Sequence, residues 1–247
     1  MTPIMQANTF TLTLEEAYML TPSVKHFVFT PENPLDYLPG QFVTIHFQHG
    51  EKMLRRSYSI ANPPTHTNAT IEFAAGFVEK GPGTELLFDL KPGDTLKATG
   101  PFGRLTLKEK DPQRYIFVAT STGITPYRAM LPVLQQRLLA VPHLAVIILQ
   151  GVQTHADLLY HQDFLAFAQQ NPPVTYRTQL SRAQPTDLEP HEYVGYVQSC
   201  FPALQLNPET DIVYLCGNPG MVDESFTDLK ERGFTIQQIV REKYISR

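Results

Sequence analysis

A short run at positions 54–62, LRRSYSIAN, places a cation, an aromatic ring and hydroxyl groups at consecutive or alternating positions. On a β-strand, Arg56 and Tyr58 would point to one face, and Ser57 and Ser59 to the other. An arginine can bind a diphosphate, an aromatic ring can cover a flat conjugated ring, and a hydroxyl can hydrogen-bond a ring nitrogen. The run could therefore bind a flavin. A half-buried strand with an exposed arginine explains it equally well.

Three further segments carry small, polar or cationic residues directly after predicted buried strands. They are residues 119–126 (ATSTGITP), 181–182 (SR) and 216–222 (CGNPGMV). Ligands of open α/β sheets bind beyond the carboxyl ends of the strands, so these segments are candidates for a nucleotide site. Free amides at a helix start suit a diphosphate, and a hydroxyl beside an arginine suits a phosphate monoester. Each segment also has an ordinary explanation: a capped turn, a solvent-facing loop pair and a buried inert cysteine.

The first part of the chain, residues 8–107, is predicted to form short strands. Turns rich in proline and glycine separate them, which is typical of antiparallel hairpins. One segment, Thr84–Leu90, instead has helical apolar spacing, with Thr84 as its predicted N-cap. The candidate strands are Thr9–Glu15, Val24–Thr30, Phe42–Phe47, Arg56–Ile60, Thr70–Phe77 and Thr95–Thr99. Six such strands predict a small antiparallel barrel.

The pattern changes after a charged, proline-containing segment at positions 108–114, and we place a domain boundary between residues 110 and 111. Beyond it, apolar strands alternate with helices, which predicts a parallel sheet with helices on its faces. Thr125 is expected to cap the first of these helices, and Pro132 to kink or split it. The predicted strands are Tyr115–Ala119, Leu144–Gln150, Val174–Leu180 and Asp211–Leu215, and the predicted helices are Pro126–Ala140, Ala156–Gln170 and Met221–Arg232.

Composition narrows the class of protein. Of the 247 residues, 42% are hydrophobic, which is enough for a packed core, and the net charge of −4 argues against a general nucleic-acid binder. Residues 1–6 lack the charged and apolar regions of a signal peptide, and no apolar run is long enough for a membrane span. Cys200 and Cys216 alone predict neither a metal cluster nor a disulfide framework. We therefore expect a cytoplasmic, metal-free protein that binds neither nucleic acid nor membrane. Separately, we expect it to be a monomer.

Four motifs occur in order along the chain and together resemble those of the ferredoxin–NADP reductase family of two-domain flavoproteins. They are residues 56–59 (RSYS), Gly83-Thr84 followed by residues 90–94 (LKPGD), residues 122–126 (TGITP) and residues 216–222 (CGNPGMV). The likeness covers nearly the whole chain. It implies a β + α/β fold, with an N-terminal antiparallel six-stranded FAD-binding barrel over 1–110. A C-terminal α/β parallel-sheet domain over 111–247 would bind the nucleotide, and its tail would return to the flavin.

The resemblance also implies roles for individual residues. Arg56 would bind the FAD diphosphate, Tyr58 would stack on the isoalloxazine, and Ser59 would lie near its N5. The other residues implied for FAD are Ser57, Ala74, Ala75, Gly76, Phe77, Pro82, Gly83 and Thr84. Those implied for NADP(H) are Thr120, Ser121, Thr122, Gly123, Pro126, Cys216, Gly217 and Pro219, with Ser181 and Arg182 for the 2′-phosphate. The residues at the reacting rings would be Tyr58, Ser59, Cys216 and Tyr244.

Two departures from the family pattern affect these expectations. Relatives often carry a second basic residue after the glycine that is Gly195 here, but this chain has Tyr196. NADP(H) is therefore favoured only slightly over NAD(H). Relatives also often end in an aromatic residue near the flavin, and here Tyr244 is followed by three more residues.

The implied activity is electron transfer from NAD(P)H through FAD to a separate one-electron carrier, ferredoxin or flavodoxin. The alternatives are a flavin reductase, the reductase component of an oxygenase, and a binding module without redox chemistry. The chain has no cysteine motif for an iron–sulfur cluster, so we expect any such cluster on a separate partner. Candidates for a basic docking patch are Lys52, Arg55, Lys243 and Arg247.

Overall fold

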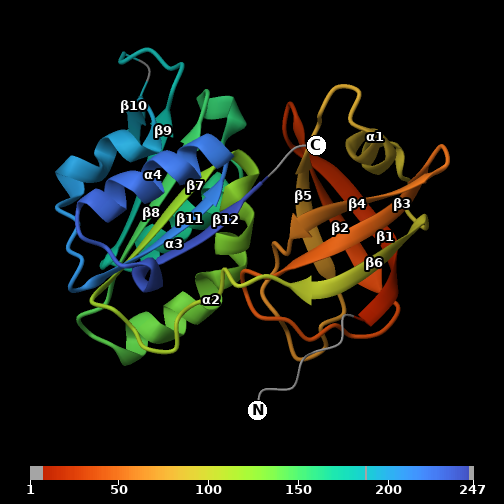
Figure 1. The fold of residues 1–247 in the computed structure, drawn as a ribbon, viewed down its shortest axis with the longest axis horizontal. Coiled ribbons are helices and arrows are strands. Elements are labelled where there is room, and N and C mark those ends of the chain that lie inside the picture. The colour runs from red at the N-terminus through yellow and green to blue at the C-terminus, as the bar shows by residue number, and fades with distance from the viewer. Residues whose placement is uncertain (1–7, 187, 245–247) are drawn as a thin grey trace. The chain divides into compact units, whose positions relative to one another are not determined.

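The computed structural model describes residues 8–186 and 188–244. Its contacts divide the chain into two compact units, Met1–Thr106 and Leu107–Arg247. Each unit contains a six-stranded sheet, antiparallel in the first and parallel in the second (Figure 1). The sequence prediction of an antiparallel β fold followed by a parallel α/β fold is confirmed.

The first unit is a barrel with strand order β4-β3-β6-β1-β2-β5. Tyr58 on β4 stacks on Phe73 of β5 with ring centroids 4.8 Å apart, so the first and last strands of the order meet. The strands are β1 (Asn8–Thr21), β2 (Val24–Pro31), β3 (Phe42–His49), β4 (Lys52–Ser59), β5 (Ile71–Gly76) and β6 (Thr95–Phe102), and the helix is α1 (Pro82–Asp89).

Alternating side chains fill the barrel. On β3, Val43, Ile45 and Phe47 are buried, while the residues between them face outward, as a strand with one buried face requires. Strand β1 extends six residues beyond the predicted end at Glu15. It pairs with both β6 and β2, and two register shifts let it bend between these partners.

Helix α1 begins earlier than the sequence predicted. Its N-cap is Gly81 and its first residue is Pro82, so Thr84 lies inside the helix and the predicted cap is wrong. The Thr84 hydroxyl instead accepts from the Val78 amide, and it lies 3.1 Å from the carbonyl oxygens of Val78 and Gly81, to either of which it can donate its one proton. A proline at the first helical position, where no amide is needed, explains the earlier start.

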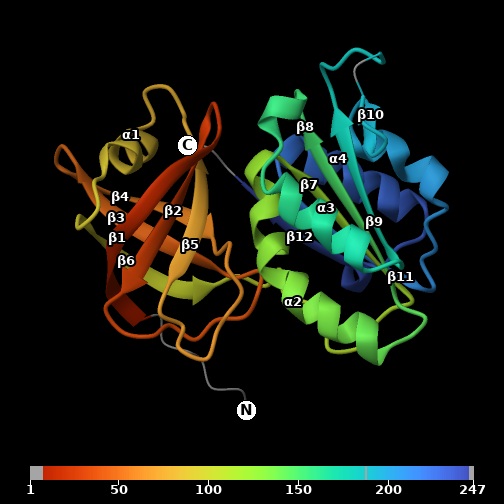
Figure 2. The same cartoon turned by 180° about the vertical axis from the view of Figure 1, so that it is seen from behind.

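The second unit has strand order β10-β9-β8-β7-β11-β12, all parallel. Helix α4 covers one face of this sheet, and α2 and α3 cover the other (Figures 1 and 2). The strands are β7 (Arg114–Thr120), β8 (Ala145–Val152), β9 (Val174–Leu180), β10 (Glu192–Val194), β11 (Asp211–Gly217) and β12 (Ile239–Lys243). The α-helices are α2 (Thr125–Ala140), α3 (His161–Gln170) and α4 (Pro219–Glu231).

Several predicted boundaries in this unit are wrong. A 3₁₀ segment, Ser121–Ile124, precedes α2, so Ile124 rather than Thr125 is the N-cap, and α2 continues through Pro132 without being split. The predicted helix from Ala156 is a 3₁₀ turn followed by α3 from His161. Strands β10 and β12 were missed because they have only three and five residues.

Candidate functional site

The side chains of strand β4 alternate between its two faces, as the sequence predicted. Tyr58 packs against the barrel core, and the Ser57 hydroxyl on the opposite face lies 2.9 Å from the hydroxyl of Thr44. Burial raises the pKa of Tyr58 to about 12, with a smaller opposing effect from Arg56. The phenol is therefore neutral at physiological pH, which suits stacking on an uncharged ring. Ser59 at the end of the strand is buried.

The start of α1 lies against the Arg56 side chain. A Cβ placed on Gly83 would be 2.9 Å from Arg56 Cγ and 3.2 Å from the Phe47 ring, so only glycine permits this approach. The first turn of a helix presents backbone amides and a positive dipole end. An arginine side chain that lies against the start of a helix in this way fits a diphosphate.

The end of β5 leads into the same region. Phe77 contacts Phe88 of α1 edge-on at 5.2 Å, and the Thr84 hydroxyl bonds the backbone of Val78. Ala74 and Ala75 are buried, Gly76 and Pro82 are half-buried, and Gly83 and Thr84 are buried. The barrel thus brings the predicted FAD residues from β4, β5 and α1 together within one unit, and this donor set fits the cofactor.

In the second unit, the ends of β7 and β11 are in tight contact. The Asn218 amide donates to the Thr120 hydroxyl over 2.9 Å, and a Cβ on Gly217 would be 2.6 Å from that hydroxyl oxygen. A Cβ on Gly123 would be 2.3 Å from the Cys216 carbonyl oxygen. Both glycines are therefore needed for this approach of two backbones. The predicted nicotinamide residues of the two strand ends do come together.

The remaining residues predicted for this half-site surround the contact. Ser121 is exposed and has a left-handed backbone, with φ at 49°, a conformation that is uncommon outside glycine. Thr122 is half-buried, Pro126 is buried in the first turn of α2, and Pro219 opens α4. All of these residues lie at the carboxyl edge of the sheet, where α/β folds bind ligands.

One buried atom at this edge lacks a partner. The Thr125 residue is 2% exposed, and its hydroxyl oxygen has no hydrogen-bond partner among the described residues. Such orphaned groups are rare in folded proteins.

The side chains of Cys216 and Tyr244 are in contact. The cysteine is fully buried, and its pKa is well above the usual range, chiefly because of burial and then because of the Glu242 charge; a hydrogen bond with the Tyr244 side chain opposes the shift. The Tyr244 amide donates to the Gly217 carbonyl over 2.8 Å. Cys216 is therefore a neutral thiol, and Tyr244 lies against it within this unit. Residues 245–247 lie outside the described residues.

This arrangement leads to a prediction for Tyr244. Replacing Tyr244 with Ala should lower KM for NADPH and change kcat at the same time, because the nicotinamide would no longer compete with the phenol ring beside Cys216. Steady-state kinetics would measure both constants. Tyr244→Phe is the matched control and should stay close to the wild type, since it keeps the ring. Constants for Tyr244→Ala equal to the wild-type values would mean that the ring does not occupy the nicotinamide position.

Ser181 and Arg182 follow β9 and remain paired to the end of β8. The Ser181 amide donates to the Val152 carbonyl over 3.0 Å, and the Arg182 amide donates to the Gln153 carbonyl over 2.8 Å. The Arg182 residue is exposed. Strands β9 and β11 are three positions apart in the sheet, roughly 14 Å at the usual strand spacing. That span suits a dinucleotide lying across the strand ends.

Some residues at the site were missed by the sequence reasoning. Asn218 caps α4 by accepting hydrogen bonds from the amides of Gly220 and Met221, and its place before a proline could have revealed it. Glu242 pairs in register with Cys216, but the five-residue β12 gives too weak a pattern to predict this.

Tyr196 was noted from the sequence only as a departure from the family pattern. It is 68% exposed and follows Gly195, whose amide donates to the Leu180 carbonyl at the end of β9. An exposed aromatic ring therefore stands where relatives often carry a cation, close to the strand that leads to Arg182.

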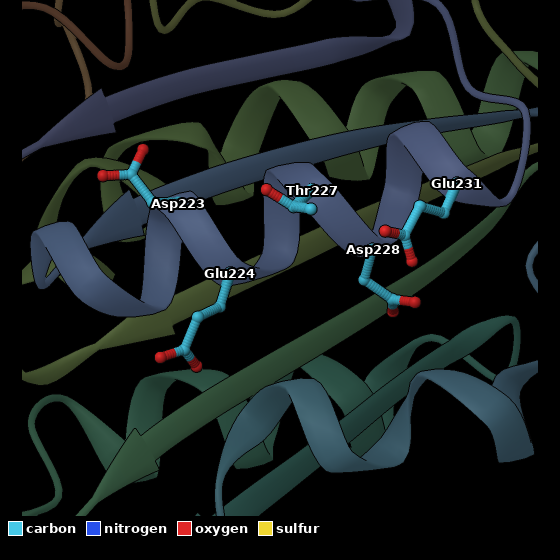
Figure 3. A pocket seen from close by; sticks show the side chains of 5 residues that line it. All are labelled: Asp223, Glu224, Thr227, Asp228 and Glu231. Carbon is cyan, nitrogen blue, oxygen red and sulfur yellow. The ribbon is translucent and has the colours of Figure 1, made fainter.

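A shallow hollow along α4 has an acidic lining but a structural explanation (Figure 3). Asp223 pairs with Lys243, Asp228 pairs with Arg232, and Glu224 accepts a hydrogen bond from Gln198. Three of its carboxylates are therefore already engaged within the unit.

None of the helices described between residues 8 and 244 is both long and apolar enough to cross a membrane.

Comparison with known proteins agrees with this geometry. Residues 11–107 match an oxidoreductase FAD-binding domain and residues 117–225 match an oxidoreductase NAD-binding domain. Ferredoxin–NADP reductase B of Sorangium cellulosum is 32% identical over 227 residues, covering 89% of this chain and 90% of the relative. The phenol hydroxylase P5 protein of Acinetobacter pittii is 25% identical over 95% of this chain, which spans 65% of that relative's length.

The fold is shared with a solved flavoprotein. A ferredoxin–NADP⁺ reductase from Neisseria gonorrhoeae with bound FAD and NADP superposes with a TM-score of 0.83 at 22% identity, covering 97% of this chain and 100% of that one. The protein is thus an FAD-dependent NAD(P)H oxidoreductase. It belongs to the ferredoxin–NADP reductase family.

Proposed function

We propose that this flavoprotein passes electrons from NAD(P)H to a separate one-electron carrier of the ferredoxin or flavodoxin type. The main support is that the two halves of a redox site are each assembled: Arg56 and Tyr58 with the start of α1, and Cys216 with Gly123 at the sheet edge. Bound FAD supplies the chemistry, because a flavin accepts a hydride and releases electrons singly. The similarity to ferredoxin–NADP reductase B supports the choice of carrier.

The residues predicted from the sequence divide between the two cofactors. Arg56 and the α1 amides hold the diphosphate of FAD, Tyr58 stacks on its ring system, and Ser59 lies beside the ring nitrogens. The strand ends at Thr120 and Cys216 receive the nicotinamide. The functional division of the chain falls between residues 110 and 111.

The 2′-phosphate of NADP(H) is bound by Arg182 together with Ser181, at the loop after β9. Arg182 is exposed, while the backbone of the loop is held to the end of β8. No side chain has to act as a general acid or base, since the protein orients two rings and excludes water.

The carrier docks on the barrel. The three neighbouring strands β4, β3 and β6 contain no aspartate or glutamate, and Lys52, Arg55 and Lys97 are exposed on them. A cationic face on a chain of net charge −4 favours an acidic partner. The two tail candidates contribute less, because Lys243 pairs with Asp223 and Arg247 lies outside the described residues.

Salt dependence tests this proposal. NADPH-driven reduction of ferredoxin or flavodoxin should slow as salt is raised, because screening shortens to about 8 Å at physiological ionic strength. Reduction of free FMN and riboflavin, measured alongside, should change little. Arg55→Glu should slow carrier reduction selectively, and Lys230→Glu on α4 is the matched control. Free flavin turning over faster than either carrier, without salt dependence, would contradict the proposal and favour a flavin reductase.

A second candidate function is the reductase component of an oxygenase. The similarity to the phenol hydroxylase P5 protein favours it, although this chain spans 65% of that relative. Adding an oxygenase component to this kinetic series as a further acceptor distinguishes the two functions, because an oxygenase partner would then accept electrons faster than ferredoxin does. A monomeric state and a cytoplasmic location remain part of the proposal.

A further inference from the structure

Three of the chain's eight histidines cluster at one edge of the parallel sheet. His161, at the start of α3, lies between His155 and His191, with ring centroids 5.8 Å and 4.8 Å away. His155 Nδ1 lies 2.5 Å from Oε1 of Glu192, the first residue of β10. The Glu192 side chain is 1% exposed, whereas that of His155 is 62% exposed. A buried carboxylate is therefore linked to solvent through a histidine.

The hydrogen bonds indicate which groups donate and which accept when the histidines of the cluster are neutral. The Tyr176 hydroxyl donates its single proton to Gln150 Oε1 over 2.6 Å, so it accepts from His161 Nδ1 at 3.2 Å. The second Glu192 oxygen accepts from the Glu189 amide over 3.0 Å. The titratable groups that face His161 are His155 on the turn before α3, Tyr176 on β9, and Glu189, His191 and Glu192 around the start of β10.

Charges within the cluster shape its titration. Burial lowers the pKa of His161, and His191 and His155 lower it further, against a smaller opposing effect of Glu192 and Glu189. Burial alone would raise the pKa of Glu192, but the Glu189 amide and His155 outweigh burial and lower this pKa. With its histidines neutral, the cluster is therefore negative. A proton on any of these histidines would offset that negative charge.

The cluster adjoins the loop that carries Ser181 and Arg182. The Arg182 amide bonds the Gln153 carbonyl, and His155 follows Gln153 by two residues, within about 7 Å along the chain. On the other side, Glu192 precedes Val194 by two residues, and Val194 pairs with Leu180 at the end of β9. The cluster is thus carried by the segments at β8 and β10, the two strands that flank β9, and the loop with Ser181 and Arg182 follows β9.

We propose that the cluster of His155, His161, His191 and Glu192 tunes the preference for the 2′-phosphate of NADPH according to pH. This inference rests on the proposed binding of that phosphate by Ser181 and Arg182. With neutral histidines, the Glu192 carboxylate repels the phosphate and weakens discrimination against NADH. Protonated histidines remove the repulsion. The cluster therefore acts as a set of specificity-determining residues beside the binding loop.

The test measures binding of 2′-phospho-AMP and of AMP to the full chain at about pH 8 and about pH 5.5, which lie on either side of the ordinary histidine pKa. The lower value leaves room for the lowered pKa of His161. Glu192→Gln should bind 2′-phospho-AMP roughly threefold to fivefold more tightly than the wild type at the higher pH, because the substitution removes a negative charge that repels the dianion. That difference should shrink at the lower pH. His155→Gln should match the wild type at the higher pH and bind more weakly at the lower one.

Control measurements distinguish a failure of this inference from a failure of the proposed phosphate site. AMP affinity should not change, and His143→Gln, just before β8 at the amino end of the strand, should follow the wild type at both pH values. If Glu192→Gln does not fold, the His155→Gln comparison decides alone. Variants that follow the wild type at both pH values would overturn the inference. Unchanged 2′-phospho-AMP binding in Arg182→Ala would instead overturn the proposed phosphate site.

Discussion

Replacing Arg182 with Ala should lower kcat/KM for NADPH by about tenfold to a hundredfold and leave that for NADH nearly unchanged. The expectation follows from a charge-assisted contact worth about 1.5–3 kcal/mol, which NADH cannot make because it carries a hydroxyl at the same position. The Arg182 backbone is held by its bond to Gln153, so the substitution removes the guanidinium without releasing the loop. Steady-state kinetics with both nucleotides would measure the effect.

Arg177→Ala is the matched control for this variant. Arg177 lies on the same strand, β9, but its guanidinium packs over the Tyr193 ring at 5.6 Å. Both nucleotides should therefore retain their kinetic constants. Equal losses for NADPH and NADH in Arg182→Ala would show that Arg182 does not bind the 2′-phosphate.

Arg56→Ala should weaken FAD binding by about 1.5–3 kcal/mol, or about tenfold to a hundredfold in Kd. Arg56 lies against Gly83 at the start of α1, so its loss leaves the helix amides as the remaining partners of the diphosphate. Binding of FAD to the apoprotein, followed by quenching of flavin fluorescence, would measure the change.

The neighbouring Arg55 provides the control for this second variant. Arg55 is exposed and points away from the barrel interior, on the opposite face of β4 from Arg56. Arg55→Ala should therefore bind FAD as the wild type does. Unchanged FAD affinity in Arg56→Ala would remove Arg56 from the diphosphate site.

The sequence predicted those features that depend on local chemistry. The alternation on β4 predicted that Arg56 and Tyr58 share a face, because strand side chains alternate wherever one side is buried. The small residues after β7 and β11 predicted two strand ends that meet, since the carboxyl ends of parallel strands share an edge.

Features that depend on tertiary contacts could not be predicted. Thr84 looks like an N-cap, but Pro82 starts the helix earlier and the threonine bonds Val78 instead. Strand β12 is too short to show the alternation of buried and exposed residues that marks a strand. The pairing of Glu242 with Cys216 could therefore not be predicted. The histidine cluster assembles residues from three separate segments that only the folded sheet brings together.

The central proposal is that this chain holds FAD and delivers electrons from NADPH through it to a carrier. Anaerobic titration of the purified, FAD-loaded protein with NADPH tests it most directly, with the visible flavin absorbance as the readout. We predict that a stoichiometric amount of NADPH bleaches the flavin and that oxidised ferredoxin or flavodoxin restores the colour. A protein that does not retain FAD, or whose flavin stays oxidised in excess NADPH, would contradict it.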